Sequence, residues 1–471
     1  MPPRPGFSFS ETRHYLPYFL MLLVFVAGVW LVLAAGARLQ PASGVKAITP
    51  APAAATSSTS ILWENFRTPL SILLTQIIVI LIMAGLFRRL FRGLGQPPVM
   101  GEMIAGIVLG PSVLGWLYPP ALSFLFPASS LDTLRQLSQI GVVLFMFIVG
   151  MEVNLRLVRE KGTAAVMISH ASIIVPFLLG TTLSLFLFRD LAPAGTSFNA
   201  FALFIGVAMS ITAFPVLARI LEDRNLTHTT LGSIAITCAA VDDVTAWCIL
   251  ALVIAIVKSA GIASSAITIG LTLVFVTMIF LVRPQLGRLV KDPDSQQHRR
   301  RLIPIILAFV LLCALTTETI GIHALFGAFV AGVIMPPSTE FRIFLKDKLE
   351  AFGSHALLPL FFAFTGLRMQ VGLLNDWQGW LMCGVIILVA IAGKLGGSMF
   401  MSRWTGMTWS RSFSIGVLMN TRGLVELVVL NIGYDLGILS GRIFAMMVLM
   451  ALVTTFMTGP LLSLVKAKET Q

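Results

Sequence analysis

Two adjacent aspartates, Asp242 and Asp243, interrupt the apolar run AAVDDVTAWCILALVIA, which is otherwise suited to the interior of a bilayer. A charged side chain at the centre of a membrane helix costs about 2.5–3.5 kcal/mol to insert, and by default such a group has a function and a partner. Carboxylates can bind a proton or, as hard oxygen ligands, a metal cation. Because neighbouring helix positions point about 100° apart, we expect one carboxylate to face a substrate crevice and the other to face a different helix.

A lysine in a second apolar run, AIAGKLGGSMF, offers a partner for one of these carboxylates. Lys394 lies about 12 Å, at 1.5 Å per helical residue, from the end of its run near Arg403. That distance is too long for the ammonium group to reach the membrane surface easily. We therefore predict a buried ion pair between Lys394 and one of the two aspartates.

Two further apolar segments, 206–223 and 416–433, carry helix-breaking residues at mid-depth. The interrupting residues are Ser210, Thr212 and Pro215 in the first segment, and Asn420, Thr421, Arg422 and Gly423 in the second. Irregular backbone at membrane depth is tolerated only where it lines a cavity or is buried in protein. Broken helices can offer carbonyl oxygens to a cation, so we predict that both segments form the site with the aspartates. An ordinary proline kink at Pro215 is the alternative for the first segment.

Three further ionisable residues lie in apolar segments, and of these Glu102 is a weaker candidate for the site. Arg422 and Glu426 are spaced i, i+4 and can pair along one helix face. Glu102, near the end of its apolar segment, is either a carboxylate at the entrance of the site or a structural one.

Membrane-spanning helices must position these residues. Of the 471 residues, 57% are hydrophobic and only 11% are charged, with a mean hydropathy of +0.91, whereas a soluble domain is nearer a quarter charged. Windows of about 20 apolar residues recur along the chain, each long enough to cross the hydrocarbon as a helix. We expect an all-α polytopic membrane protein with about 14 transmembrane helices. The expected spans are 16–36, 66–89, 97–118, 134–155, 163–188, 198–222, 228–257, 262–282, 302–320, 322–337, 353–372, 378–402, 410–433 and 442–465.

The net charge of +12 follows from membrane topology, and we expect no nucleic-acid partner. Threading the spans with the N-terminus inside puts most Lys and Arg in cytoplasmic loops, including a loop at 342–348, and leaves both termini cytoplasmic. We expect a location in the bacterial inner (plasma) membrane. Segment 16–36 is either an uncleaved helix, which we favour, or a signal peptide, and 37–60 is expected to be an external linker.

Two pairs of segments repeat in the same order. GEMIAGIVLGP (101–111) resembles GAFVAGVIMP (327–336), and LFMFIVGMEVNL (144–155) resembles LFFAFTGLRMQV (360–371). With the N-terminus inside, the first segment of each half, 101–111 and 327–336, would enter the membrane from opposite sides. The sequence therefore predicts an inverted repeat, which is the plan of many secondary transporters, with the site near mid-membrane.

Five motifs in order resemble the monovalent cation:proton antiporters, in the branch that holds bacterial sodium/proton and potassium/proton antiporters and the plant cation/proton exchangers. The motifs are PPVMGEMIAGIVLGPSVLG, SITAFPVLARILED, AAVDDVTAW, GIHALFGAFVAGVIMP and MNTRGLVELVVLNIG, and the resemblance covers roughly residues 66–465. It implies a sodium/proton-antiporter-like fold with two crossed broken helices. Residues 1–65 would be the N-terminal helix and linker, and 66–470 the exchanger domain. Its core helices would be about 163–257 and 378–465, and its panel helices, which would form a homodimer, about 66–155 and 302–372.

The resemblance also implies a role for each candidate residue. Asp243 would carry the cation and the proton alternately, and Asp242 would pair with Lys394. A dehydrated Na⁺, K⁺ or Li⁺ would bind Asp243 with help from Asp242, Ser210, Thr212 and the broken-helix backbone. We expect the two acids to titrate as a coupled system and expect no cofactor.

The expected function is therefore exchange of a monovalent cation for protons by alternating access, not an enzymatic reaction. An intramembrane aspartyl protease is disfavoured, because it needs two aspartates from separate helices that face one water. An organic-anion symporter of similar architecture and an uncoupled cation channel stay open. The sequence does not distinguish Na⁺ from K⁺, because neither the size nor the field strength of the site can be read from it.

Overall fold

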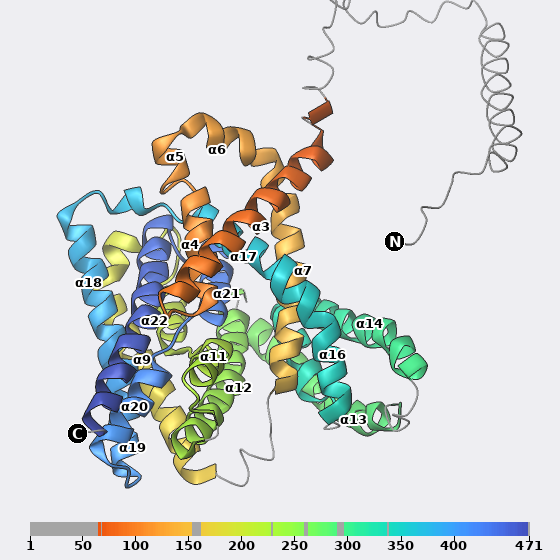
Figure 1. The fold of residues 1–471 in the computed structure, drawn as a ribbon, viewed down its shortest axis with the longest axis vertical. Coiled ribbons are helices and arrows are strands. Elements are labelled where there is room, and N and C mark those ends of the chain that lie inside the picture. Colours follow the sequence, from red (N-terminus) through yellow and green to blue (C-terminus); the bar gives the residue numbers. More distant parts are fainter. Residues whose placement is uncertain are drawn as a thin grey trace, which may run out of the picture. The chain divides into compact units, whose positions relative to one another are not determined.

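The computed structural model describes residues 65–66, 68–152, 162–227, 229–258, 262–289, 296–336 and 339–469. The chain divides into two compact units, residues 1–66 and 67–471, and the fold given below is that of the second unit. Within the described ranges every regular element is a helix (Figure 1). The expected span 16–36 and the expected linker 37–60 lie outside the described residues.

Ten helices of the described chain are long and apolar enough to cross a membrane, or eleven if a bent pair counts as one span. They are α3 (Pro69–Gly93), α4 with α5 (Pro98–Leu109 and Leu114–Leu117), α7 (Ala128–Glu152), α9 (Gly162–Leu191), α10 with α11 (Phe198–Ser210 and Phe214–Asp223), α12 (Thr230–Lys258), α13 (Ile262–Leu289), α14 (Gln296–Ile320), α18 with α19 (Trp377–Ile391 and Gly397–Trp404), the bent pair α20 and α21 (Trp409–Met419 and Leu424–Asp435) and α22 (Gly441–Glu469). A short helix, α6 (Pro119–Leu125), precedes α7. The predicted all-α polytopic fold is confirmed.

Two of the thirteen spans expected from residue 66 onward are shorter helices. α15 (Ala324–Val333) has 10 residues, which corresponds to about 15 Å or half of the hydrocarbon thickness. α17 (Leu358–Arg368) has 11 residues and lies between a π-helical turn, η1 (Gly353–Leu357), and a 3₁₀ turn, η2 (Val371–Leu374). Hydropathy counts apolar residues and does not detect where a helix ends, so these two segments seemed long enough to span.

A helix also replaces the loop expected at 342–348. α16 (Thr339–Phe352) buries Phe341 and Leu345, which are spaced i, i+4 on one face. Arg342 on the same helix donates to the backbone oxygens of Met151 at 2.7 Å and Met335 at 2.7 Å. α16 therefore closes over the ends of α7 and α15.

The predicted repeat has a direct counterpart in the packing. α4 crosses α17 where Gly106 meets Gly366, and α15 crosses α7 where Gly332 meets Gly150. In the sequence repeat, Gly106 corresponds to Gly332 and Gly366 to Gly150, so one contact is made twice with the partners exchanged. Each glycine is required, because an added Cβ would overlap backbone atoms of the opposing helix.

The later helices of each half pack around α9, which contacts α10, α12 and α19. α18 and α19 join through a π-helical turn, η3 (Ala392–Gly396), which also lies against α9. A stacked pair, Trp247 of α12 and Phe329 of α15, with ring centroids 6.0 Å apart, joins this group to the crossing at Gly332. The two aspartates of α12 are buried within this group.

Candidate cation site

The two broken helices cross in direct contact. The chain leaves the helical conformation at Ile211–Ala213, between α10 and α11, and at Asn420–Gly423, between α20 and α21. The backbone N–H of Ala213 donates to the carbonyl oxygen of Thr421 at 3.0 Å. Thr212 Oγ1 lies 3.2 Å from the carbonyl oxygen of Met419. Each break therefore satisfies polar backbone groups of the other, as helix ends inside a membrane require.

Asp242 is fully buried and lies within hydrogen-bonding distance of four groups. Its Oδ1 accepts from the hydroxyl of Ser169 at 2.5 Å. Its Oδ2 accepts from Ser172 at 2.8 Å, from Thr212 at 2.6 Å and from Lys394 at 3.0 Å. These donors come from α9, from the first break and from η3, so Asp242 connects three parts of the bundle.

Lys394 is also fully buried and uses its whole donor capacity. Besides the ion pair with Asp242, its ammonium group donates to the carbonyl oxygens of Ser172, at 3.0 Å, and of Ser210. It projects from the π-helical turn η3, a type of bulge that often occurs at functional sites. Ser210 ends α10, so the positive charge of Lys394 lies at the negative end of that half-helix dipole.

Arg422 and Glu426 form a second buried ion pair, 3.3 Å apart. The guanidinium group of Arg422 donates to the carbonyl oxygens of Ala208 at 3.0 Å and Met209 at 2.7 Å, which also belong to the last turn of α10. Glu426 lies in the first turn of α21, where a helix dipole favours negative charge. Each charge of this pair therefore lies at a half-helix end of opposite sign.

Asp243 differs from its neighbour. It is 1% exposed, and neither carboxylate oxygen has a hydrogen-bond partner among the described residues. One turn further along α12, the indole nitrogen of Trp247 also lacks one. A buried carboxylate without a donor is costly unless it binds a proton or a cation. Asp243 is therefore the acid of the pair that is available to a ligand.

The remaining predicted residues have varied surroundings. Ser210 donates its hydroxyl to Val207 of its own helix at 2.8 Å, so that only its carbonyl faces the Lys394 contact. Asn420 Nδ2 lies 3.8 Å from the Met457 sulfur, and its Oδ1 has no partner among the described residues. Gly423 directly precedes α21, and an added Cβ would lie 2.9 Å from a methyl group of Val216.

The structure does not bring Glu102 into contact with the aspartates. Its Oε1 forms an ion pair with Arg88 Nε of α3 at 2.8 Å, and its side chain is buried. Of the two roles left open for Glu102, this contact favours the structural one.

Three hydroxyl groups of the site were not predicted from the sequence. Ser169 and Ser172 bind Asp242, and Thr455 of α22 accepts the N–H of Arg422 at 3.0 Å and donates to its carbonyl oxygen at 2.7 Å. The i, i+3 spacing of the two serines in an apolar span was the available signal.

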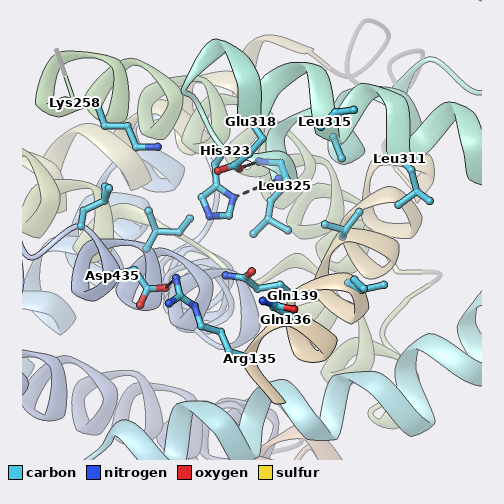
Figure 2. Close-up of a pocket in the computed structure, with 16 residues that line it drawn as sticks. Arg135, Gln136, Gln139, Lys258, Leu311, Leu315, Glu318, His323, Leu325 and Asp435 are labelled. Carbon is cyan, nitrogen blue, oxygen red and sulfur yellow. Dashed lines mark hydrogen bonds and ion pairs between the residues drawn. The ribbon is translucent and has the colours of Figure 1, made fainter. Parts of the chain in front are cut away.

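Two hollows lie on either side of the crossing of the two broken helices. A hollow of ≈ 370 Å³ lies between α7 and α11, and Glu152, Pro215, Ala218 and Lys346 are among its lining residues. A hollow of ≈ 580 Å³, shown in Figure 2, is lined by residues from the other ends of α7, α12 and α21, including Arg135, Lys258, His323 and Asp435. Because Pro215 lies in the first turn of α11, the smaller hollow extends to the residues beside the break.

A repeat whose halves meet at two crossed broken helices, with acids and a lysine buried at the crossing, defines the class of secondary transporters. Within that class, this chain belongs to the sodium/hydrogen exchanger family: the family described as "Sodium/hydrogen exchanger, transmembrane" matches residues 55–467. The predicted resemblance to cation:proton antiporters is thereby confirmed.

Individual relatives agree with this assignment. The chain is 45% identical over 395 residues to the Na(+)/H(+) antiporter NhaS4 of Synechocystis sp., covering 83% of this chain and 96% of the relative. It is 41% identical to the cation/H(+) antiporter 17 of Arabidopsis thaliana, covering 88% of this chain and 50% of the relative. It is 34% identical to the K(+)/H(+) antiporter 1 of Saccharomyces cerevisiae, covering 85% and 47%. The chain therefore spans about half the length of these plant and yeast relatives and nearly the whole of the cyanobacterial one.

A solved structure has the same fold. The sodium proton antiporter MjNhaP1 from Methanocaldococcus jannaschii superimposes with a TM-score of 0.61, at 14% identity, covering 84% of this chain and 96% of that chain. This likeness confirms the predicted sodium/proton-antiporter-like fold.

Proposed function

We propose that this integral membrane protein exchanges Na⁺ or K⁺ for protons across the membrane by alternating access. The observation that supports it best is the buried Asp243, whose carboxylate has no hydrogen-bond partner among the described residues, beside an Asp242 that is already neutralised by Lys394. The relatives that share the family act, by their names, on Na⁺, on K⁺ or on cations together with H⁺.

The transport step follows from competition for one carboxylate. A proton and a metal cation cannot both occupy Asp243, so binding of either one releases the other. Within the part of the chain that the structure describes, Oδ1 of Asp242 accepts one hydrogen bond, from Ser169, and keeps acceptor capacity for the same cation. Thr212 and the backbone oxygens of the breaks would complete the oxygen shell. The cation is cargo in this account, and Li⁺ would bind in the same way.

The ion pairs at the half-helix ends fix the site whether it is open to one side of the membrane or to the other. Lys394 and Arg422 together hold the last three carbonyl oxygens of α10, at residues 208–210. The core can then move as one body, because its breaks are internally satisfied and do not need new partners when the entrance changes. In this proposal the core helices are about 163–257 and 378–465, and they move against panel helices at about 66–155 and 302–372.

The wider arrangement is part of the same proposal. Both termini would be cytoplasmic in a bacterial inner membrane, which puts the hollow beside Glu152 on the cytoplasmic side. The panel helices would form a homodimer. A long apolar stripe on α3, with Leu70, Leu74, Ile78 and Ile82 exposed, supports contact of this helix with lipid or a second copy.

Purified protein reconstituted into vesicles that contain a pH-sensitive dye tests the proposal. With the membrane potential clamped, an imposed gradient of Na⁺ or K⁺ should move protons in the opposite direction in the parent chain, and Asp243→Asn should abolish this movement. Cation flux that does not move protons would indicate a channel. Proton movement that needs an organic anion would indicate a symporter. Either result contradicts the proposal.

A further inference from the structure

We propose that a polar latch between α21 and the helices α7 and α17 holds one entrance of the transporter closed, and that it must open in each transport cycle. The polar latch consists of Arg135, Thr365, Arg368, Asn431 and Asp435. The inference rests on alternating access in the proposed function and goes beyond it, because it assigns the residues that determine which entrance is open.

The latch is a continuous set of contacts. Asp435, the last residue of α21, pairs with Arg368 of α17 at 2.6 Å and with Arg135 of α7 at 3.1 Å. One turn earlier, Asn431 accepts from Arg368 at 2.9 Å and donates to Thr365 of α17 at 2.9 Å. All four contacts join α21, a predicted core helix, to predicted panel helices.

Arg368 is the centre of the latch. Its side chain is only 14% exposed, and its guanidinium carbon lies 4.3 Å from the ring centre of Phe364 and 5.3 Å from that of Tyr434. The aromatic rings limit access of water to the ion pair, which strengthens it relative to an exposed one. Tyr434 belongs to α21 and Phe364 to α17, so the rings also bridge the two helices.

The equivalent helices of the other repeat line a hollow. The motif IGVAMS at 205–210 resembles IGVLMN at 415–420, so α11 corresponds to α21 and Ala218 to Val428. The match of Gly150 with Gly366 makes α7 correspond to α17. Residues of α7 and α11 line the ≈ 370 Å³ hollow, where Ala218 is partly exposed, whereas Val428 is 2% exposed. One helix pair is therefore joined by the latch, and its counterpart borders a hollow.

This difference predicts what changes during transport. When the hollow beside Ala218 closes, α21 must separate from α17, which breaks three latch contacts, and from α7, which breaks the fourth. Figure 2 shows Arg135 and Asp435 at the larger hollow, with Glu318 and His323 facing them. This larger hollow is the path to the site that opens when the latch releases.

Thiol accessibility of two equivalent reporter positions tests the latch without measuring transport. Ala218→Cys and Val428→Cys are introduced separately into the full chain, and labelling by a membrane-impermeant maleimide is measured in detergent. The labelling of the parent chain, whose Cys248 is exposed, is subtracted. We expect Ala218→Cys to be labelled and Val428→Cys to be protected. Adding Asp435→Asn should raise labelling of Val428→Cys at least about fivefold and lower that of Ala218→Cys.

Labelling changes of opposite sign at the two reporters distinguish a change in which entrance is open from loss of folding, because unfolding would raise labelling at both positions. If Asp435→Asn prevents folding, Arg135→Gln should give a smaller change with the same signs, because Arg135 is the more exposed partner. Asp376→Asn is the matched control. It removes an aspartate–arginine pair, with Arg442, that joins α18 to α22 and should leave both reporters unchanged.

Asp435→Glu should restore the parent pattern, since it can still accept from both arginines. Unchanged protection of Val428→Cys in both Asp435→Asn and Arg135→Gln would overturn the latch, as would equal labelling increases at both reporters. Loss of cation-driven proton movement in the parent chain would instead count against the proposed function.

Discussion

Asp242 and Asp243 are neighbours in one helix, yet Asp242 accepts hydrogen bonds from four groups and Asp243 accepts none from the described residues. The helical offset of about 100° produces this difference, because it directs Asp242 toward α9 and Lys394 while Asp243 faces away from them. In the proposed function, the first acid maintains the structure of the crossing and the second binds the transported ion.

Removing Lys394 should destabilise the protein strongly. Lys394→Met leaves Asp242 as a buried charge without its counter-ion, which typically costs about 3–5 kcal/mol. The double variant Lys394→Met with Asp242→Asn should be clearly more stable than the single one, since it removes both charges. The melting temperature in detergent measures this. Lys348→Met, at an exposed pair with Asp347, is the control and should melt like the parent. A double variant that is no more stable than Lys394→Met would contradict the ion pair as described.

The two glycine crossings should be equally intolerant of a side chain. Gly106→Ala and Gly332→Ala each place a Cβ against backbone atoms that cannot rotate away, so each should lower stability by about 1–3 kcal/mol or more. Gly85→Ala and Gly384→Ala, where an added Cβ meets nothing within 4 Å, should be neutral or stabilising by up to about 1 kcal/mol. Comparison of the four melting temperatures checks this. If Gly106→Ala were tolerated but Gly332→Ala were not, the two crossings would not be equivalent.

The apparent affinity for the cation should fall as the pH falls. If one proton and one cation compete for Asp243, the KM for the cation rises about tenfold for each pH unit in the acidic range, while the maximal rate at saturating cation stays constant. Initial rates of exchange in vesicles over a range of cation concentrations and pH values provide this measurement. A constant KM with a falling maximal rate would instead place the titrating group outside the cation site.

The sequence predicted much of this site because its charged groups lie within apolar helices. Asp242, Lys394 and Arg422 were conspicuous for that reason. Ser169 and Ser172 were missed because a hydroxyl can bond to the carbonyl of its own preceding turn, so serines occur in membrane helices without any function. Only the three-dimensional arrangement shows that these two face an aspartate.

Other features depended on where helices end, which hydropathy does not report. α15 has 10 residues where a span at 322–337 was expected, α17 continues from α16 through the π-helical turn η1, and α16 forms a helix from residues that looked like a basic loop. Asp435 was not predicted either, because a charge at a helix end is ordinary. Its significance follows from Arg135 and Arg368, which are 300 and 67 positions away in the chain and adjacent in space.

Proton release from the purified protein on cation addition tests the central claim most directly. In a weakly buffered detergent solution with a pH indicator, the parent chain should release protons when Na⁺ or K⁺ is added, and the release should saturate. Asp243→Asn should release none, whereas Asp376→Asn should behave like the parent. Undiminished release from a folded Asp243→Asn variant would contradict the assignment of Asp243 as the group that exchanges a proton for a cation.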